Sequence, residues 1–148
     1  MTDYIRNKKA TFDFELMERY EAGAELLGTE TKSIRHGQGK LTGAYVVVRG
    51  GEIYLVGASI PPFQKANAPK SYDDQRPRKL LLSRKEIEEL FTASEKNGLT
   101  IVPIRWYNNG RRLKLEIAIA RGKKKFDKRE TLRDRDSKRS IERILKTQ

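Results

Sequence analysis

The sequence predicts a mainly β fold in which a small antiparallel sheet closes into a barrel and a basic tail follows. Three observations predict it. Apolar and polar residues alternate along several segments, as they do in half-buried strands. Tight turns or short helices join most of these segments, which favours antiparallel pairing. A small antiparallel sheet avoids bare edges by closing on itself, and about 120 residues suffice for one such core.

The first half of the chain predicts three strands and a short helix. A strand is expected over 18–27, where four apolar residues alternate with polar ones or glycine: Tyr20, Ala22, Ala24 and Leu26. Thr29 can cap a helix over 29–35, which the glycine at position 37 ends. Two further strands, 45–48 and 53–56, flank Arg49-Gly50-Gly51-Glu52, a typical hairpin turn.

The second half predicts a loop, a helix and a second hairpin. Three prolines make 60–75 a loop. Ser83 and Glu86 fit a capping box that opens a helix ending near position 97. The strands 99–107 and 111–120 flank an Asn-Asn-Gly turn.

Composition excludes several classes of protein. The chain has 148 residues, no cysteine and one histidine, which rules out disulfides, cysteine-based zinc sites and multi-histidine metal sites. It has no apolar run of membrane-spanning length and no signal-peptide core, so we expect a cytoplasmic protein without a membrane partner. The net charge of +12 indicates a polyanionic partner, most often nucleic acid, although high charge can also serve solubility alone.

The charge is concentrated at the C-terminal end. Residues 121–148 contain 12 basic and 5 acidic side chains, whereas residues 1–120 contain 20 and 15. We therefore expect a body over 1–120 and a tail over 121–148 that is disordered when free. Ile141, Ile144 and Leu145 share one helical face, so the tail could become an amphipathic helix on a partner. The alternative is an idle, solubilising tail.

Catalytic and metal-binding patterns are weak. His36-Gly37-Gln38-Gly39 follows a helix instead of opening one, so it fits a turn better than a phosphate site. Asp73 and Asp74 have no third acidic partner nearby in the sequence. We expect no enzyme activity, no cofactor and no metal.

Basic residues near apolar or aromatic ones carry a stronger signal. Arg76, Arg78 and Lys79 precede a leucine run, and Arg105 adjoins Trp106 and Tyr107, with Lys114 on the next strand. Lys32 and Arg35 lie three residues apart on one helix face. Such groups bind phosphates and stack on unpaired bases. For the two aromatic residues the alternative is packing in the core or at the barrel edge, and Lys32 could instead pair with an acid such as Glu30.

Several strings, taken in order, resemble the SmpB family, which partners transfer-messenger RNA in bacterial ribosome rescue. They run from position 7 to 129 and are Asn7-Lys8-Lys9-Ala10, Tyr20-Glu21-Ala22-Gly23, Gly28-Thr29-Glu30-Thr31-Lys32-Ser33-Ile34-Arg35, Arg76-Pro77-Arg78-Lys79-Leu80-Leu81-Leu82, Asn97-Gly98-Leu99-Thr100-Ile101-Val102-Pro103, Ala120-Arg121-Gly122-Lys123-Lys124 and Phe126-Asp127-Lys128-Arg129. Each string is moderately specific, and the ordered set is highly specific.

The resemblance implies an oligonucleotide-binding-like closed barrel of about six antiparallel strands with two to three flanking helices. It implies a monomer that catalyses nothing. The protein would bind the transfer-RNA-like domain of transfer-messenger RNA, in place of the missing anticodon arm. Elongation factor Tu would deliver the charged complex to a stalled 70S ribosome. There the tail would become helical and sense the empty messenger channel beside the decoding centre.

The resemblance also carries over site residues. Asn7, Glu21, Leu81 and Lys114 match positions used for RNA contact or for shaping that surface. They join the cations predicted above, Lys32, Arg35, Arg76, Arg78 and Lys79. On the tail, Gly122, Lys123 and Lys124 match a stretch near the decoding centre, and Asp127, Lys128 and Arg129 match a triplet needed for accommodation.

Two positions depart from the family pattern, and one rival function stays open. Ser83 stands where His or Asn is common, and the helix cap explains it. Phe126 stands where His or Tyr is common. Its ring keeps the ability to stack on a ribosomal RNA base, but it lacks the polar group of those residues. Glu21 would accept hydrogen bonds from a base edge or order a nearby loop. The rival reading is a structural, ribosomal-type protein whose basic tail threads ribosomal RNA permanently.

Overall fold

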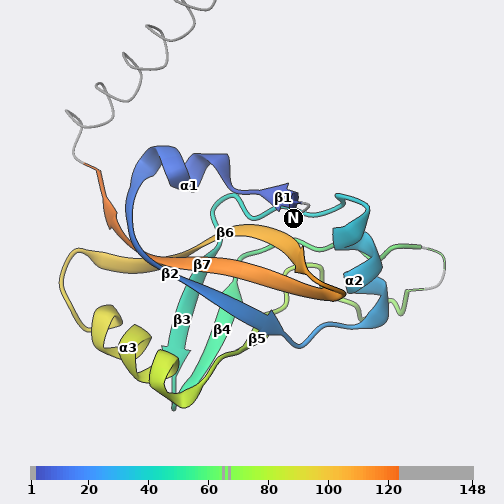
Figure 1. The fold of residues 1–148 in the computed structure, drawn as a ribbon. Helices are drawn as coiled ribbons and strands as arrows, with labels where there is room; N and C mark the ends of the chain where they lie inside the picture. Colours follow the sequence, from blue (N-terminus) through green and yellow to red (C-terminus); the bar gives the residue numbers. More distant parts are fainter. Residues whose placement is uncertain (1–2, 65, 67, 124–148) are drawn as a thin grey trace, which may run out of the picture.

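One antiparallel sheet of seven strands dominates the computed structural model, which describes residues 3–64, 66 and 68–123 (Figure 1). The described part of the chain also holds three helices. The elements, in chain order, are β1 (Asp3–Arg6), α1 (Lys8–Asp13), β2 (Phe14–Ala24), α2 (Gly28–Arg35), β3 (Tyr45–Arg49), β4 (Glu52–Val56), β5 (Arg78–Leu81), α3 (Arg84–Ser94), β6 (Leu99–Asn109) and β7 (Arg112–Gly122).

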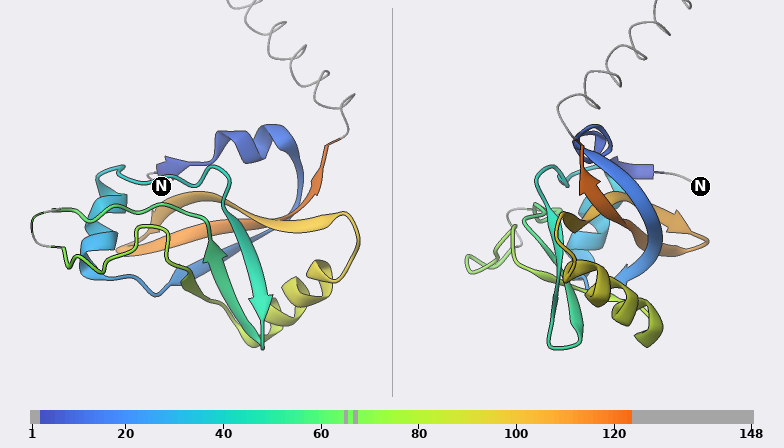
Figure 2. Two further views of the ribbon diagram at one scale, coloured as in Figure 1. Left: turned by 180° about the vertical axis from the view of Figure 1, so that it is seen from behind. Right: turned by 90° about the vertical axis from the view of Figure 1, so that its left-hand side faces the viewer.

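The sheet is curled but is not closed by hydrogen bonds. Its strand order is β1-β6-β7-β2-β5-β4-β3, and every paired neighbour is antiparallel. The curl brings β3 next to the start of β6, yet within the described residues no ladder joins the two (Figure 2). Apolar side chains of the common core fill this seam instead, Val46 and Val48 from β3 and Leu99 and Ile101 from β6. The mainly β prediction is confirmed, and the closed barrel is corrected to a curled, open one.

The N-terminal segment forms β1 and α1, two elements that the local sequence pattern does not predict. Asn7 caps α1, because its side-chain oxygen accepts a hydrogen bond from the Ala10 N–H at 3.2 Å. The helix is too short to show an apolar periodicity, and it is held by packing of Ala10 against Val102 and Ile104. Tertiary contacts, which local patterns do not report, therefore decide this segment.

Two strands differ from the expected bounds. The strand predicted over 18–27 runs from Phe14 to Ala24, because a bulge between Leu16 and Arg19 breaks the alternation that would have revealed its first half. The short strand β5 was not predicted as a strand. It alternates inward and outward residues, but its first inward residue is an arginine, Arg78, which hides the pattern.

The other elements match their predicted bounds closely, but the predicted capping of α2 by Thr29 is wrong. Leu27 is the N-cap, and the Thr29 hydroxyl accepts from the Phe63 N–H at 2.8 Å instead. The β3–β4 hairpin turns at Gly50 and Gly51, which both have positive φ (57° and 78°), as a tight two-residue hairpin turn requires. Ser83 and Glu86 form the predicted capping box of α3. The second hairpin pairs β6 with β7, and β7 continues to Gly122, two residues past the expected end of the body.

The main core lies inside the curl of the sheet. Fully buried side chains from α2, β4 and β7 meet there, namely Ile34, Ile53, Leu55, Leu115 and Ile117. Trp106 joins them at 1% exposure, so its packing alternative is confirmed. A smaller cluster lies under α1 on the outer side of β6 and β7. None of the described helices is long and apolar enough to cross a membrane.

Candidate nucleic-acid interface

Three of the site residues implied by the family resemblance meet on the outer face of the sheet. Glu21 lies on β2, Leu81 on β5 and Lys114 on β7, and all three point away from the core. Gly23 lies between them, paired in register with Leu81. A Cβ atom at Gly23 would lie 3.3 Å from the Leu81 Cβ and 3.7 Å from the Lys114 Nζ. The missing side chain therefore lets the leucine and the ammonium group come together over β2.

Hydrogen bonds fix the Glu21 carboxylate on this face. Tyr107 donates its hydroxyl to Glu21 Oε1 at 2.5 Å, and Asn109 donates its side-chain amide to the same oxygen at 3.0 Å. The bond from Tyr107, helped by Asn109 and by the charge of Lys114, holds the pKa of Glu21 below its usual value. Glu21 is thus an ordered, ionised acceptor beside a cation, and the residues that hold it belong to strand β6. A contact of Glu21 with a base edge stays a prediction.

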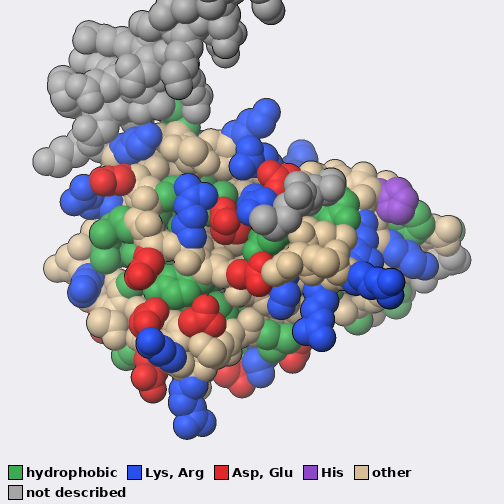
Figure 3. Space-filling model, viewed as in Figure 1, with side chains coloured by type: hydrophobic (Ala, Val, Ile, Leu, Met, Phe, Trp, Pro, Cys, Tyr) green, Lys and Arg blue, Asp and Glu red, His purple; other side chains and the backbone are tan. Residues whose placement is uncertain are grey.

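The string Arg105-Trp106-Tyr107 forms no stacking platform. Trp106 points into the core, and the Tyr107 ring is covered by the Arg105 guanidinium, whose central carbon lies 4.1 Å from the ring centroid. Arg105 also pairs with Asp3 and with Glu116, and Arg19 pairs with the other oxygen of Glu116 at 3.2 Å. These ion pairs form a row of alternating basic and acidic side chains. Figure 3 shows basic and acidic side chains mixed over the surface of the molecule.

Arg78 is not available to a phosphate, which corrects its assignment as an RNA-contacting cation. Its side chain is fully buried, and its guanidinium donates to Glu30 Oε2 at 2.6 and 3.1 Å and to two backbone carbonyls. Glu30 is buried as well and also binds Arg76, Tyr72 and the Leu27 N–H. Burial raises the pKa of Glu30, but these donors outweigh it and keep the carboxyl ionised. The Glu30–Arg78 ion pair ties α2 to β5, and the bonds of Glu30 to Arg76 and Tyr72 tie it to the 57–77 loop.

Asn7 is also interior, with 3% of its surface exposed. Its side-chain amide donates to the Pro103 carbonyl at 2.9 Å and to the Leu41 carbonyl at 3.2 Å, while its oxygen caps α1. One side chain therefore joins three segments of the chain. Of the two roles that the resemblance left open for it, the geometry favours shaping the surface over touching RNA.

The remaining cations are spread around the body. Lys32 and Arg35 are exposed on α2, and Arg35 donates to the Arg111 carbonyl at 3.0 Å, which brings it to the β6–β7 turn. Lys32 does not take Glu30 as its partner, since Arg76 and Arg78 hold that carboxylate. Lys79 pairs with Glu52 at 3.2 Å. Arg35 therefore lies near the β6–β7 turn, and Lys79 lies on the same outer side of β5 as Leu81.

The described part of the tail root continues the sheet. Gly122 pairs with Phe14, and the Lys123 N–H donates to the Asp13 carbonyl at 2.9 Å. The other tail residues predicted to act on the ribosome, Lys124, Phe126, Asp127, Lys128 and Arg129, lie outside the described residues. Among the residues that the structure does describe, no group of acidic or histidine side chains could hold a metal ion.

Two residues of this face were missed by the sequence analysis, Tyr107 and Asn109 as holders of Glu21. The sequence contains a weak indication of their role. They lie two apart on a strand, which places them on one face, but nothing local indicates that this face meets Glu21, 86 positions away.

Comparison with known proteins agrees with the motifs. The family model described as SmpB protein matches residues 4–147. An SsrA-binding protein of Rubrobacter xylanophilus is 46% identical over 147 residues, covering 99% of this chain and 97% of its own. One of a Roseiflexus species is 47% identical, covering 95% of this chain and 89% of its own. A chain of the solved structure "tmRNA-SmpB: a journey to the center of the bacterial ribosome" is 39% identical, with a TM-score of 0.68, covering 87% of this chain and 94% of that one.

Proposed function

Because the chain belongs to the SmpB family, we propose that it binds transfer-messenger RNA and acts with it in trans-translation on the ribosome. The membership also confirms the prediction of a binding protein instead of an enzyme. The observation that carries the proposal is the outer face on which Glu21, Leu81 and Lys114 meet around Gly23.

This face supplies three kinds of contact. Lys114 offers a cation to a backbone phosphate, which gives affinity without sequence preference. The half-exposed Leu81 offers an apolar surface to an unstacked base or a ribose. Glu21 offers an ordered carboxylate to a base amino group. The combination suits a folded RNA with exposed loop bases, such as the transfer-RNA-like domain.

The body and the tail divide the work in this proposal. The body would recognise the transfer-RNA-like domain and stand in for the anticodon arm, and elongation factor Tu would deliver the charged complex. The basic tail would enter the messenger channel of a stalled 70S ribosome and report that it is empty. The protein would act as a monomer in the cytoplasm.

Truncation tests this division. The cut belongs after Lys123, because β7 pairs as far as Gly122 and the Lys123 N–H binds Asp13. At fixed physiological salt, residues 1–123 should bind the transfer-RNA-like domain nearly as well as the full chain, and much better than an ordinary transfer RNA. The same truncation should abolish tagging of nascent chains on stalled ribosomes. Loss of binding, or no preference over transfer RNA, would instead make the protein a general basic-tailed RNA binder.

A further inference from the structure

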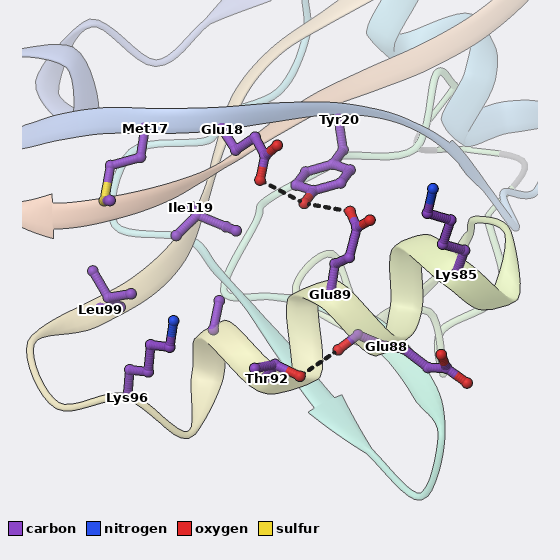
Figure 4. Close-up of a pocket in the computed structure, with 11 residues that line it drawn as sticks. Met17, Glu18, Tyr20, Lys85, Glu88, Glu89, Thr92, Lys96, Leu99 and Ile119 are labelled. Atoms are coloured by element: carbon purple, nitrogen blue, oxygen red, sulfur yellow. Dashed lines mark hydrogen bonds between the residues drawn. The ribbon is translucent and has the colours of Figure 1, made fainter.

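A groove of about 820 Å³ lies between α3 and the strands β2, β6 and β7 (Figure 4). Its apolar lining comes from four side chains, those of Met17, Ala93, Leu99 and Ile119. Met17 is 55% exposed. The groove therefore offers accessible apolar surface to a partner.

A bulge in β2 turns two successive residues toward this groove. The ladder between β2 and β7 shifts its register between Leu16 and Arg19. Two residues of β2, Met17 and Glu18, therefore stand opposite one residue of β7, Ile119. Successive residues of a regular strand point to opposite faces, but Met17 and Glu18 both line the groove. The bulge thus places an apolar and an acidic side chain together.

Three carboxylates line the groove beside the apolar side chains, those of Glu18, Glu88 and Glu89. The Tyr20 hydroxyl lies 2.9 Å from Glu89 Oε2 and 3.2 Å from Glu18 Oε2 (Figure 4). Burial and the two carboxylates raise the pKa of Tyr20, so its phenol stays neutral. A neutral phenol has one proton and donates to only one carboxylate at a time. Two like charges are therefore held close together with a single shared donor.

The charge of these carboxylates is not balanced by an ion pair. Within residues 3–64, 66 and 68–123, no ion pair includes Glu18, Glu88 or Glu89. Lys85 and Lys96 line the groove toward its two ends without pairing with them (Figure 4). Such a cluster is unusual on a chain whose formal net charge is +12. It attracts a cationic occupant and repels RNA phosphates.

The groove and the proposed RNA-binding face lie on opposite sides of β2. Tyr20 points to the inner side and Glu21, the next residue, to the outer side, as successive residues of a strand do. An occupant of the groove would therefore leave the proposed RNA-binding face free.

We propose that this groove binds a basic segment of another protein, in which an arginine is flanked by an aliphatic residue. The guanidinium lies between Glu18 and Glu89, since its five N–H donors can serve two carboxylates at once. The aliphatic side chain packs on Met17 and Ile119. Charge complementarity selects this occupant, and the apolar lining selects the neighbour of the arginine. The inference needs no RNA and is independent of the proposed function.

Titration of the full-length, isotope-labelled protein with a synthetic peptide tests the proposal by NMR. The probe is a short, capped peptide in which arginine alternates with leucine. Amide signals along α3, over 17–20 and at Ile119 should shift, with little change at the Gly50–Gly51 turn of the β3–β4 hairpin. The same peptide with citrulline, the uncharged counterpart of arginine, should bind at least about tenfold more weakly, because the charge-assisted contacts are lost.

Matched variants of the protein sharpen the test. Glu18→Gln with Glu89→Gln should weaken binding of the arginine peptide by about tenfold. Both glutamines keep an oxygen that accepts from the Tyr20 hydroxyl, so the fold is retained. Glu95→Gln should leave binding unchanged, because Glu95 is an exposed acid at the C-terminal end of the same helix and does not line the groove.

Several outcomes would overturn the proposal. They are equal binding of the citrulline peptide, shifts centred outside the groove, and an equal loss of binding in Glu95→Gln. Groove signals that shift with protein concentration alone would assign the groove to a second copy of this chain, and groove signals that shift with a single-stranded RNA would assign it to RNA. The expected peptide response in a protein that fails to bind the transfer-RNA-like domain would support this inference while rejecting the proposed function.

Discussion

Two glutamates of this protein are held by the same kinds of groups and do different work. Glu21 accepts from the Tyr107 hydroxyl and lies near Lys114, while Glu30 accepts from the Tyr72 hydroxyl and pairs with Arg76 and Arg78. Both carboxyls have a lowered pKa. Glu21 is exposed on the sheet, and Glu30 is fully buried under the 57–77 loop. The two carboxylates have similar partners, so the difference between them is burial. Glu21 is exposed and accessible to a ligand, whereas Glu30 is inaccessible and joins parts of the chain.

The largest expected effect follows from breaking the buried tie. Arg78→Ala leaves the Glu30 carboxylate buried with fewer donors, which should lower the free energy of unfolding by about 3–5 kcal/mol. Denaturant unfolding monitored by fluorescence of Trp106 measures it. Arg112→Ala, an exposed arginine, is the control and should change stability by less than about 0.5 kcal/mol. A small effect of Arg78→Ala would mean that the pair is not stabilising.

On the exposed side, Lys114→Ala should weaken binding of the transfer-RNA-like domain by about tenfold, because it removes one charge-assisted contact. The slope of log affinity against log salt should fall by about 0.7–0.9, the contribution of one phosphate. Stability should stay nearly constant. Lys96→Ala, on the opposite side of β2, serves as the matched control. Equal losses for the two lysines would remove Lys114 from the interface.

Removing the hydroxyl of Tyr72 or of Tyr107 should have effects of intermediate size, and the two variants can be compared directly. Tyr72→Phe removes a hydroxyl whose one proton lies within reach of both the Ile60 carbonyl and Glu30, which should cost about 1–3 kcal/mol of stability without changing RNA affinity. Tyr107→Phe removes the donor to Glu21 and should lower RNA affinity more than stability. Measuring unfolding and RNA binding for both variants tests the contrast, which fails if they behave alike.

The smallest expected effect concerns acid pH. The folded-state pKa of Glu21 is below the reference value of 4.5, so its stabilising contribution is present above that value and is lost as pH falls through the folded pKa. Glu21→Gln should therefore be less stable than the parent near pH 6, by less than about 0.5 kcal/mol for so exposed a group, and equal to it at low pH. Unfolding curves at several pH values measure the difference; a gap that widens in acid would contradict it.

The sequence predicts this fold well wherever its signals are local. The capping box of α3, the glycines of the β3–β4 turn and the alternation along β7 are each readable within a dozen residues, and each is found in place. The α1 helix is not readable in this way, because Asn7 is held by carbonyls 34 and 96 positions away.

The candidate site shows the same division. Cation-rich strings and the family resemblance name its residues, but they do not say which cations are free. Arg78 looks like its neighbours Arg76 and Lys79 in the sequence, and only the fold shows that it is buried against Glu30, 48 positions away. The meeting of Glu21 with Tyr107 is equally non-local. Residue type indicates which side chains could bind a phosphate or a base. Long-range packing decides which of those side chains are exposed.

The way β7 ends has a mechanical consequence. This strand lies between β2 and β6 and is laddered to both, and the ladder reaches the root of the tail, where Gly122 pairs with Phe14 and Lys123 binds Asp13. A pull on the tail along the strand axis would load the hydrogen bonds on both sides in parallel, in shear, instead of peeling them one at a time. Tension arriving through the tail would thus be carried into the middle of the sheet, next to the strand that holds Glu21.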